Sequence, residues 1–256
     1  MAIIKKFRIT TFKKEINKIS LQKISLSYNK RQILDDVSFN VREGEICGLL
    51  GPNGVGKSTI FNIIVGLVKP NYGNIFINQK NVTEIPIYKR SVDFGLSIVP
   101  QSGGIFSNLT CLENLKAISE IVLKNKSERN FRIEKMISKF ELDAVKNTKA
   151  KHLSGGQRKK VSIAMSLISN PKIILMDEPF AGVDPIGIND IKNLIKHLTE
   201  RNIGILITDH QSREVLDTCE YSYIMYSGQI IAEGDSNKII GDQEARKFYL
   251  GEAYRA

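Results

Sequence analysis

A glycine-rich segment contains the first residues whose types and spacing suit a chemical task. It reads Gly51-Pro52-Asn53-Gly54-Val55-Gly56-Lys57-Ser58-Thr59 and lies between an apolar run and a helical pattern, which is the context of a phosphate-binding loop. Glycines let backbone N–H groups approach phosphate oxygens, and a helix start adds further amides. We expect Lys57 to contact the β- and γ-phosphates of a nucleotide and the Ser58 hydroxyl to bind Mg²⁺. The other predicted phosphate-site residues are Gly51, Asn53, Gly54, Gly56 and Thr59.

Two adjacent carboxylates form the second candidate feature. Residues 173–176 are an apolar run that leads into Asp177 and Glu178. Ligands of parallel sheets bind at the carboxyl ends of the strands, so this pair is suited to face a bound nucleotide. We expect Asp177 to hold Mg²⁺ through water, and Glu178 to act as general base or to orient the attacking water. A solvated strand end is the alternative for an isolated Asp-Glu pair, and the preceding phosphate loop favours the functional interpretation.

Apolar periodicity predicts the elements that position these residues. Strands are predicted at 23–28, 37–41, 45–50, 173–176, 204–208 and 223–225. Helices are predicted to begin near Lys57, Gly155, Pro185 and Ser212. Two more helical patterns occupy residues 111–140, with predicted inward faces formed by Leu112, Leu115, Ile118, Ile121 and Val122, and by Phe131, Ile133, Met136, Ile137 and Phe140. This alternation predicts an α/β fold with a parallel sheet covered by helices on both faces.

The segment Leu153-Ser154-Gly155-Gly156-Gln157 narrows the class of nucleotide-binding protein. It resembles the signature pentapeptide of the ABC ATPase family, and the resemblance extends over about residues 20–250. In that family the segment begins a helix and binds the γ-phosphate of a nucleotide held by the opposite subunit. The resemblance therefore implies a homodimer with ATP and Mg²⁺ at its interface. The implied contacts are Ser154, Gly155, Gly156 and Gln157, and Ser154 also suits the N-cap of the helix.

Four further positions match motifs of the ABC ATPase family. Gln101 resembles the glutamine that senses Mg²⁺ and the attacking water, and Asp184 resembles the aspartate that organises contacts between the two sites. His210 resembles the histidine that contacts the γ-phosphate and helps to orient Glu178. A lone histidine after a strand is more often structural, but its position in the family pattern favours the catalytic role. Tyr28 lies where the family places an aromatic that stacks on adenine, with a plain strand aromatic as the alternative.

The same resemblance implies an overall organisation. The fold would be an α/β P-loop NTPase with a mixed or parallel sheet core, an N-terminal antiparallel β part and an inserted helical lobe. We expect a basic N-terminal extension at 1–19 and an ABC ATPase domain at 20–256. Within that domain, the helical lobe would cover about 102–168 and a C-terminal tail about 235–256.

Some stretches resemble the ATPases of bacterial lipopolysaccharide export in particular. Examples are Glu178-Pro179-Phe180-Ala181-Gly182-Val183-Asp184-Pro185 and the ending Tyr249-Leu250-Gly251-Glu252-Ala253-Tyr254-Arg255. This resemblance implies an ATPase on the cytoplasmic face of the inner membrane that drives integral membrane subunits. Their coupling helices would dock on Ile105, Phe106 and Leu109, although Phe106 could instead anchor the helical lobe. An ATPase of a branched-chain amino-acid importer, with a similar layout and ending, is the alternative.

Composition and charge are consistent with a cytosolic protein. The chain has 256 residues, is 42% hydrophobic and carries a net charge of +10, about half of it within residues 1–20. We interpret that basic start as a solvated extension, with binding to anionic lipid as the alternative. The remaining positive charge is dispersed, which does not indicate nucleic-acid binding. No apolar run reaches the ~18–20 residues of a membrane-spanning helix, so attachment to the membrane is expected only through partners.

Scattered cysteines and histidines suggest no further chemistry. Cys47, Cys111 and Cys219 lie among apolar neighbours, so we expect buried thiols in a reducing compartment. His152 and His197 match no motif and are expected at the surface.

Two other function classes fit the sequence less well. A soluble ABC protein of translation or DNA repair would usually have two cassettes or a long coiled coil, and this chain has one cassette without sustained heptads. A regulator that binds nucleotide without hydrolysis would not need Glu178, Gln101 and His210 together.

Overall fold

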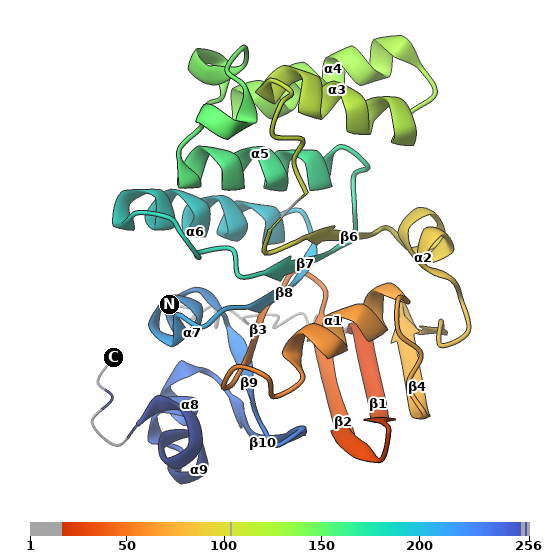
Figure 1. The fold of residues 1–256 in the computed structure, drawn as a ribbon, viewed down its shortest axis with the longest axis vertical. Coiled ribbons are helices and arrows are strands. Elements are labelled where there is room, and N and C mark those ends of the chain that lie inside the picture. Colours follow the sequence, from red (N-terminus) through yellow and green to blue (C-terminus); the bar gives the residue numbers. More distant parts are fainter. Residues whose placement is uncertain (1–16, 103, 252–253, 255–256) are drawn as a thin grey trace, which may run out of the picture.

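Two sheets and the helices around them make up the protein (Figure 1). The computed structural model describes residues 17–102, 104–251 and 254, so most of the predicted basic extension lies outside the described residues. One sheet is antiparallel, with the strand order β2-β1-β4-β5, and the other has the order β10-β9-β3-β8-β7-β6. The strands are β1 (Asn17–Tyr28), β2 (Arg31–Arg42), β3 (Ile46–Leu50), β4 (Tyr72–Ile77), β5 (Lys80–Asn81), β6 (Leu96–Val99), β7 (Ile173–Asp177), β8 (Gly204–Thr208), β9 (Tyr221–Tyr226) and β10 (Gln229–Gly234).

The antiparallel sheet begins with a tight hairpin. Tyr28 pairs with Arg31, and the two residues between them, Asn29 and Lys30, have φ angles of 47° and 68°. Positive φ at both central positions is the geometry of a two-residue turn whose twist matches the strands. β1 therefore pairs with β2 on one side and with β4 on the other. This sheet is the predicted N-terminal antiparallel part of the fold.

The larger sheet is mixed, because its strands are parallel except β10, which runs antiparallel to β9. Its central strands are mostly apolar, and β3 and β8 are buried at every residue. A strand with helices or a second sheet on both faces needs apolar side chains at every position, which explains these uninterrupted runs. The predicted α/β class is therefore confirmed.

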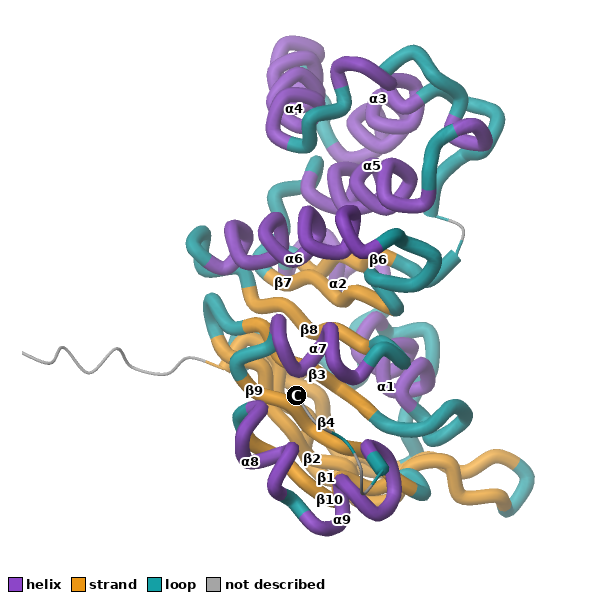
Figure 2. Tube along the Cα trace, turned by 90° about the vertical axis from the view of Figure 1, so that its left-hand side faces the viewer, coloured by secondary structure: helices purple, strands orange, loops and turns teal. Residues whose placement is uncertain are grey.

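The helices divide between the two faces of the larger sheet. They are α1 (Lys57–Val65), α2 (Ile87–Phe94), α3 (Cys111–Val122), α4 (Lys126–Lys139), α5 (Gly155–Leu167), α6 (Pro185–Thr199), α7 (Ser212–Thr218), α8 (Ser236–Gly241) and α9 (Gln243–Ala245), with the short turns η1 (Asp143–Val145), η2 (Ala150–His152) and η3 (Arg246–Leu250). α1 and the antiparallel sheet pack on one face of the larger sheet, whereas α5, α6 and α7 cover its other face. α3 and α4 lie beyond α5, farthest from the antiparallel sheet (Figures 1 and 2).

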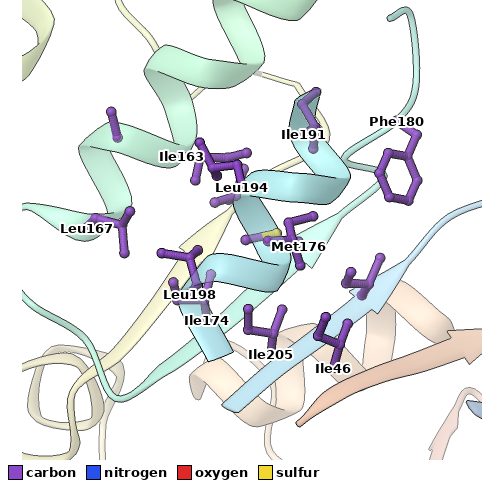
Figure 3. Packing of buried hydrophobic residues seen from close by; sticks show 14 of the residues in the cluster. Ile46, Ile163, Leu167, Ile174, Met176, Phe180, Ile191, Leu194, Leu198 and Ile205 are labelled. Carbon is purple, nitrogen blue, oxygen red and sulfur yellow. The ribbon is translucent and has the colours of Figure 1, made fainter. Parts of the chain in front are cut away.

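Successive side chains of β7 point to opposite faces of the sheet and belong to two different core clusters. Ile174 and Met176 pack against α5 and α6, as Figure 3 shows around Leu194 and Leu198. Their neighbours Ile173 and Leu175 point to the opposite face and join the cluster that includes α1. Both clusters pack against β7, so its last residue, Asp177, and the following Glu178 are held on a buried strand.

The faces that α3 and α4 bury differ in part from those predicted from the sequence. Ile121, Val122 and Phe131 are exposed, with relative exposures of 78%, 43% and 64%. In α3 the buried face instead includes the fully buried Asn114, whose amide nitrogen donates to the Phe106 carbonyl oxygen at 3.1 Å. Hydrophobic periodicity misplaced the face of α3 because a polar residue with satisfied hydrogen bonds takes an inward position.

The buried end of α4 provides a stability test. Phe140 caps the C-terminus of α4 and is 1% exposed. Phe140→Ala should lower the free energy of unfolding by about 3–5 kcal/mol, because it removes a ring from a closed core. Phe131→Ala, on the exposed side of the same helix, should change it by less than about 0.5 kcal/mol. Urea unfolding of both variants checks this pair, and equal losses would contradict the assigned faces.

Residues without a predicted chemical role lie as expected. Cys47, Cys111 and Cys219 are free and buried, and burial raises the pKa of Cys111 to about 11. His152 and His197 are exposed. Across the described part of the chain, no helix has the length and apolar character needed to span a membrane.

Candidate functional site

The glycine-rich loop connects β3 to α1, as predicted. β3 ends at Leu50 and α1 begins at Lys57, with Gly56 as its N-cap at φ 113°. A Cβ atom on Gly51 would lie 2.3 Å from the Met225 carbonyl oxygen, so only glycine fits there. The loop therefore passes close to β9 and presents the first turn of α1, with Ser58 and Thr59, beside it. Backbone amides at such a helix start attract phosphate.

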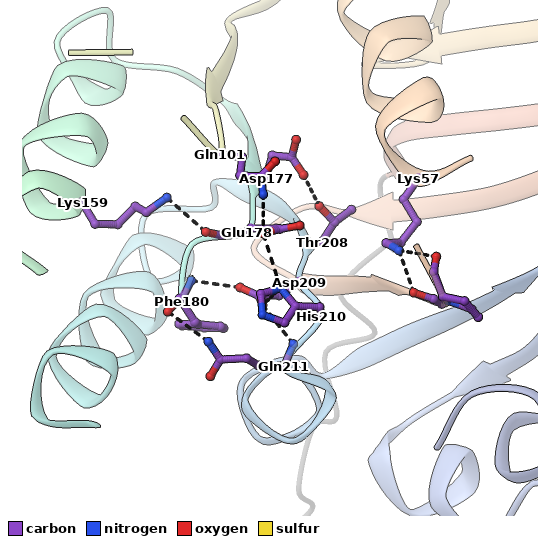
Figure 4. Close-up of polar contacts among 12 residues, drawn as sticks. Lys57, Gln101, Lys159, Asp177, Glu178, Phe180, Thr208, Asp209, His210 and Gln211 are labelled. Atoms are coloured by element: carbon purple, nitrogen blue, oxygen red, sulfur yellow. Dashed lines mark hydrogen bonds and ion pairs between the residues drawn. The ribbon is translucent and has the colours of Figure 1, made fainter. Parts of the chain in front are cut away.

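Lys57 lies between the glycine-rich loop and the acidic strand end. Its Nζ donates to the carbonyl oxygens of Gly51 and Pro52 at 2.6 and 2.8 Å (Figure 4). Burial lowers the pKa of Lys57, while the nearby carboxylates of Glu178 and Asp177 act in the opposite direction. The ammonium group is thus held at the loop and lies within the field of the two predicted acidic residues.

The end of β7 presents the two predicted carboxylates in different ways. Asp177 Oδ1 accepts a hydrogen bond from Thr208 Oγ1 at 2.6 Å. Glu178 follows with a φ of 48°, a left-handed conformation that non-glycine residues seldom adopt, and its N–H donates to the Thr208 carbonyl oxygen at 2.7 Å. The end of β8 therefore fixes both acidic residues, and the backbone turns sharply at Glu178.

Two predicted catalytic side chains meet the Glu178 carboxylate. Gln101 Nε2 donates to Glu178 Oε2 at 2.6 Å, and His210 Nδ1 lies 3.4 Å from the same oxygen (Figure 4). Gln101 follows β6, Glu178 follows β7 and His210 follows β8, so neighbouring parallel strands deliver all three. The structure thus brings together three residues that the sequence placed far apart.

Sequence reasoning missed a second layer of hydrogen bonds behind these residues. The fully buried Asp209 accepts from the Phe180 N–H through Oδ2 and from the Gln211 N–H through Oδ1, both at 3.0 Å. Gln211 Nε2 in turn donates to the Phe180 carbonyl oxygen at 3.1 Å. These contacts tie the segment after Glu178 to the segment around His210. An acidic residue directly before the predicted histidine was the available signal.

The Ser-Gly-Gly segment begins α5. Ser154 is its N-cap, as predicted, and forms a reciprocal capping box with Gln157. A Cβ atom on Gly155 would lie 2.1 Å from the Gly182 carbonyl oxygen, so the start of α5 and the segment before α6 are in close contact. Asp184 caps α6 by accepting from the Gly187 N–H at 3.0 Å, which lowers the pKa of Asp184.

The remaining predicted residues lie at the surface. Tyr28, at the end of β1, is 51% exposed, and so is Phe106, in the loop before α3. Ile105 and Leu109 are half-buried near Phe106. Asn114 holds this loop because its Oδ1 accepts from the Phe106 N–H at 2.7 Å. The Phe106 ring is therefore exposed on a fixed backbone.

Donors suited to Mg²⁺ are present at the predicted positions. Ser58 offers a hydroxyl in the first turn of α1, Asp177 a carboxylate, and Gln101 an amide oxygen. The described residues contain no group of three or more His, Cys, Asp or Glu side chains that could hold a metal ion. Mg²⁺ commonly binds one or two protein ligands together with substrate phosphates. The donor set fits an ion that is shared with a nucleotide.

A phosphate loop opposite an acidic strand end defines a nucleotide-binding α/β protein. Residues 34–181 match the ABC transporter family. The lipopolysaccharide export system ATP-binding protein LptB of Acidithiobacillus ferridurans is 41% identical over 93% of this chain and 98% of that protein. A solved nucleotide-free ATP-binding cassette from an ABC transporter has a TM-score of 0.81 and 33% identity, covering 93% of this chain and 100% of the other. A cassette solved as a dimer in a post-hydrolysis state with ADP and phosphate has a TM-score of 0.76 and 28% identity, covering 85% and 98%. The chain belongs to the ABC transporter family, as an ATPase domain.

Proposed function

We propose that this ATPase works as a homodimer that powers lipopolysaccharide export from the bacterial inner membrane. The observation that supports the catalytic part is the convergence of Gln101 and His210 on one oxygen of Glu178. The relative named for lipopolysaccharide export, 41% identical over 93% of the chain, supports lipopolysaccharide as the cargo. The same similarity favours lipopolysaccharide export over the alternative function, the import of branched-chain amino acids.

The proposed nucleotide site uses the glycine-rich loop and its surroundings. Amides of Gly51, Asn53, Gly54 and Gly56 and the start of α1 at Thr59 would surround the phosphates. Lys57 would move its ammonium group from the loop carbonyls to the β- and γ-phosphates, and Tyr28 would stack on adenine. Ser58 and Gln101 would hold Mg²⁺ directly and Asp177 would hold it through water, and the ion would supply positive charge to the phosphates when it is bound with ATP.

Glu178 is the proposed general base. Gln101 and His210 hold Oε2, so Oε1 is the oxygen proposed to face the attacking water. As the water oxygen bonds to the γ-phosphorus, the bond to the ADP oxygen breaks and a water proton passes to Glu178. His210 would also contact the γ-phosphate.

The second half of each site is proposed to come from the other copy. α1 and α5 belong to opposite sides of the larger sheet, which supports a nucleotide shared between two chains. Ser154, Gly155, Gly156 and Gln157 of one copy would bind the γ-phosphate held by the other copy, and Asp184 would organise contacts between the sites. Hydrolysis then removes the phosphate link and lets the dimer open.

The membrane partners are proposed to dock beside the Gln101 loop. An inserted helical lobe at about 102–168 would carry Ile105, Phe106 and Leu109 to the coupling helices of integral membrane subunits. The exposed ring of Phe106 on a fixed loop supports this docking surface. The protein would then lie at the cytoplasmic face of the inner membrane. A C-terminal tail at about 235–256 and a basic extension at 1–19 complete the proposed organisation.

Replacing Phe106 tests the docking proposal. Phe106→Ala should retain ATP binding and weaken association with the membrane subunits by about 2 kcal/mol or more, as expected for an aromatic anchor. Co-purification from detergent-solubilised membranes, with identification of bound partners and lipid, is the measurement. Phe131→Ala removes another exposed ring, on α4, and serves as the control; Phe131 is 64% exposed and Phe106 is 51% exposed. Undiminished co-purification of Phe106→Ala would count against the docking surface.

A further inference from the structure

Lys159 is a buried lysine that has no role in the proposed hydrolysis step. It lies in the second turn of α5 and is 8% exposed. Lysine is almost never buried unless its charge has a partner. Here Nζ donates to the main-chain carbonyl oxygen of Glu178 at 3.1 Å (Figure 4). The ammonium group therefore contacts the backbone of the residue that carries the proposed general base.

The Glu178 backbone needs such support. Its left-handed φ of 48° is a sparsely populated conformation that persists only where surrounding groups hold it. The Glu178 N–H donates to the Thr208 carbonyl oxygen at 2.7 Å, and the Glu178 carbonyl oxygen accepts from Lys159 Nζ at 3.1 Å and, over a longer distance of 3.4 Å, from the Ala181 N–H. Both polar groups of this residue's main chain are thus held, and the direction in which its carboxylate leaves the chain depends on them.

The surroundings of Lys159 favour an electrostatic role over simple packing. Burial lowers the pKa of Lys159, and the carboxylates of Asp209, Asp177 and Glu178 act in the opposite direction. The adjacent Lys160 instead forms an ion pair with Asp190 at 2.8 Å, on α6. Lys160 therefore contacts α6, whereas Lys159 points toward the carboxylates of the proposed site.

Lys159 also lies where three functional segments meet. It lines a cavity of about 310 Å³ together with Gln101, Gly155 and Gly182. Gln101 contacts the Glu178 carboxylate, Gly155 begins the helix of the Ser-Gly-Gly segment, and Gly182 precedes Asp184. A shift of α5 would move the ammonium group and the Glu178 peptide together.

We infer that Lys159 is a positioning residue for ATP hydrolysis: its ammonium group fixes the Glu178 peptide and so orients the carboxylate of its own site. Because Lys159 belongs to the helix that starts with Ser154, it joins that segment mechanically to the general base of the same chain. This inference rests on the proposed role of Glu178.

The test compares three variants in the full-length chain. Lys159→Met keeps the length of the apolar stem and removes the charge, Lys159→Arg restores a donor, and Lys160→Met removes the neighbouring charge. In Lys159→Met we expect kcat to fall about 10- to 100-fold, as for a misplaced catalytic group, with KM and the Kd for ATP unchanged. Lys159→Arg should recover most of kcat, and Lys160→Met should behave as the unaltered protein.

Several results would overturn the inference. An unchanged kcat in Lys159→Met would remove the positioning role. Parallel losses of kcat and ATP affinity that arginine does not rescue would indicate a general structural role instead. Glu178→Gln, measured alongside, separates the two claims: if it stalls while Lys159→Met turns over normally, only the role of Lys159 fails. Full turnover in Glu178→Gln would overturn both.

Discussion

Glu178→Gln should lower the turnover number for ATP by about 10²- to 10⁴-fold, the usual contribution of a positioned general base. The amide keeps the size of the side chain and can still contact Gln101 and His210, but it cannot accept the proton of the attacking water. ATP binding should be retained, because the phosphates are held by the glycine-rich loop and not by this carboxylate. Phosphate release under saturating Mg-ATP checks the turnover, and titration with a fluorescent ATP analogue checks that binding is retained.

Glu134→Gln is the matched control for the loss of the carboxylate. Glu134 is exposed on α4, away from β7, so the same chemical change should leave turnover unaltered. Normal turnover in Glu178→Gln would remove the assigned role. So would a similar loss in both variants, because the effect would then not depend on the position of the carboxylate.

Lys57→Met should weaken ATP binding about 10- to 100-fold, the range expected when a charge-assisted hydrogen bond is lost. The Lys57 ammonium group lies at the loop, with Gly51 and Pro52 as its present partners, so it can reach a phosphate without a change in the backbone. Methionine retains most of the apolar stem, and the stability of the fold should therefore change little. Titration with a fluorescent ATP analogue gives the affinity, and thermal unfolding verifies the fold.

Lys69→Met is the control for the loss of a lysine charge. Lys69 forms an exposed ion pair with Glu84 at 2.8 Å, and such surface pairs contribute little to stability. Its affinity for ATP should match that of the unaltered protein. Equal affinities in Lys57→Met and Lys69→Met would refute the proposed phosphate contact.

The features that the sequence predicted are those encoded by short segments. The loop from Gly51 to Thr59 needs a particular backbone shape within a few residues, and Gly54 and Gly56 adopt positive φ angles of 78° and 113° there. The acidic pair at the end of β7 follows an apolar strand whose pattern is also local. Ser154 as an N-cap depends only on Gln157 three residues later. Each of these signals can be recognised without knowing what lies across the fold.

The features that the sequence did not predict depend on contacts between distant segments. Lys159 and Glu178 lie far apart in the sequence, and the distant partner of Asp209 is the Phe180 backbone, which carries no side-chain signal. The inward position of Asn114 in α3 follows from the Phe106 loop and not from hydrophobicity. Periodicity reports how apolar a face is, but a buried polar residue with good partners contributes nothing to that signal.

Sedimentation of Glu178→Gln protein with saturating Mg-ATP tests the sharing of nucleotide between two chains most directly. Each copy has a mass of 28.8 kDa. We expect a species of twice this mass with Mg-ATP and the single copy without nucleotide. A stalled, nucleotide-loaded protein that remains a single copy, both in solution and in its membrane complex, would rule out a nucleotide shared between two chains.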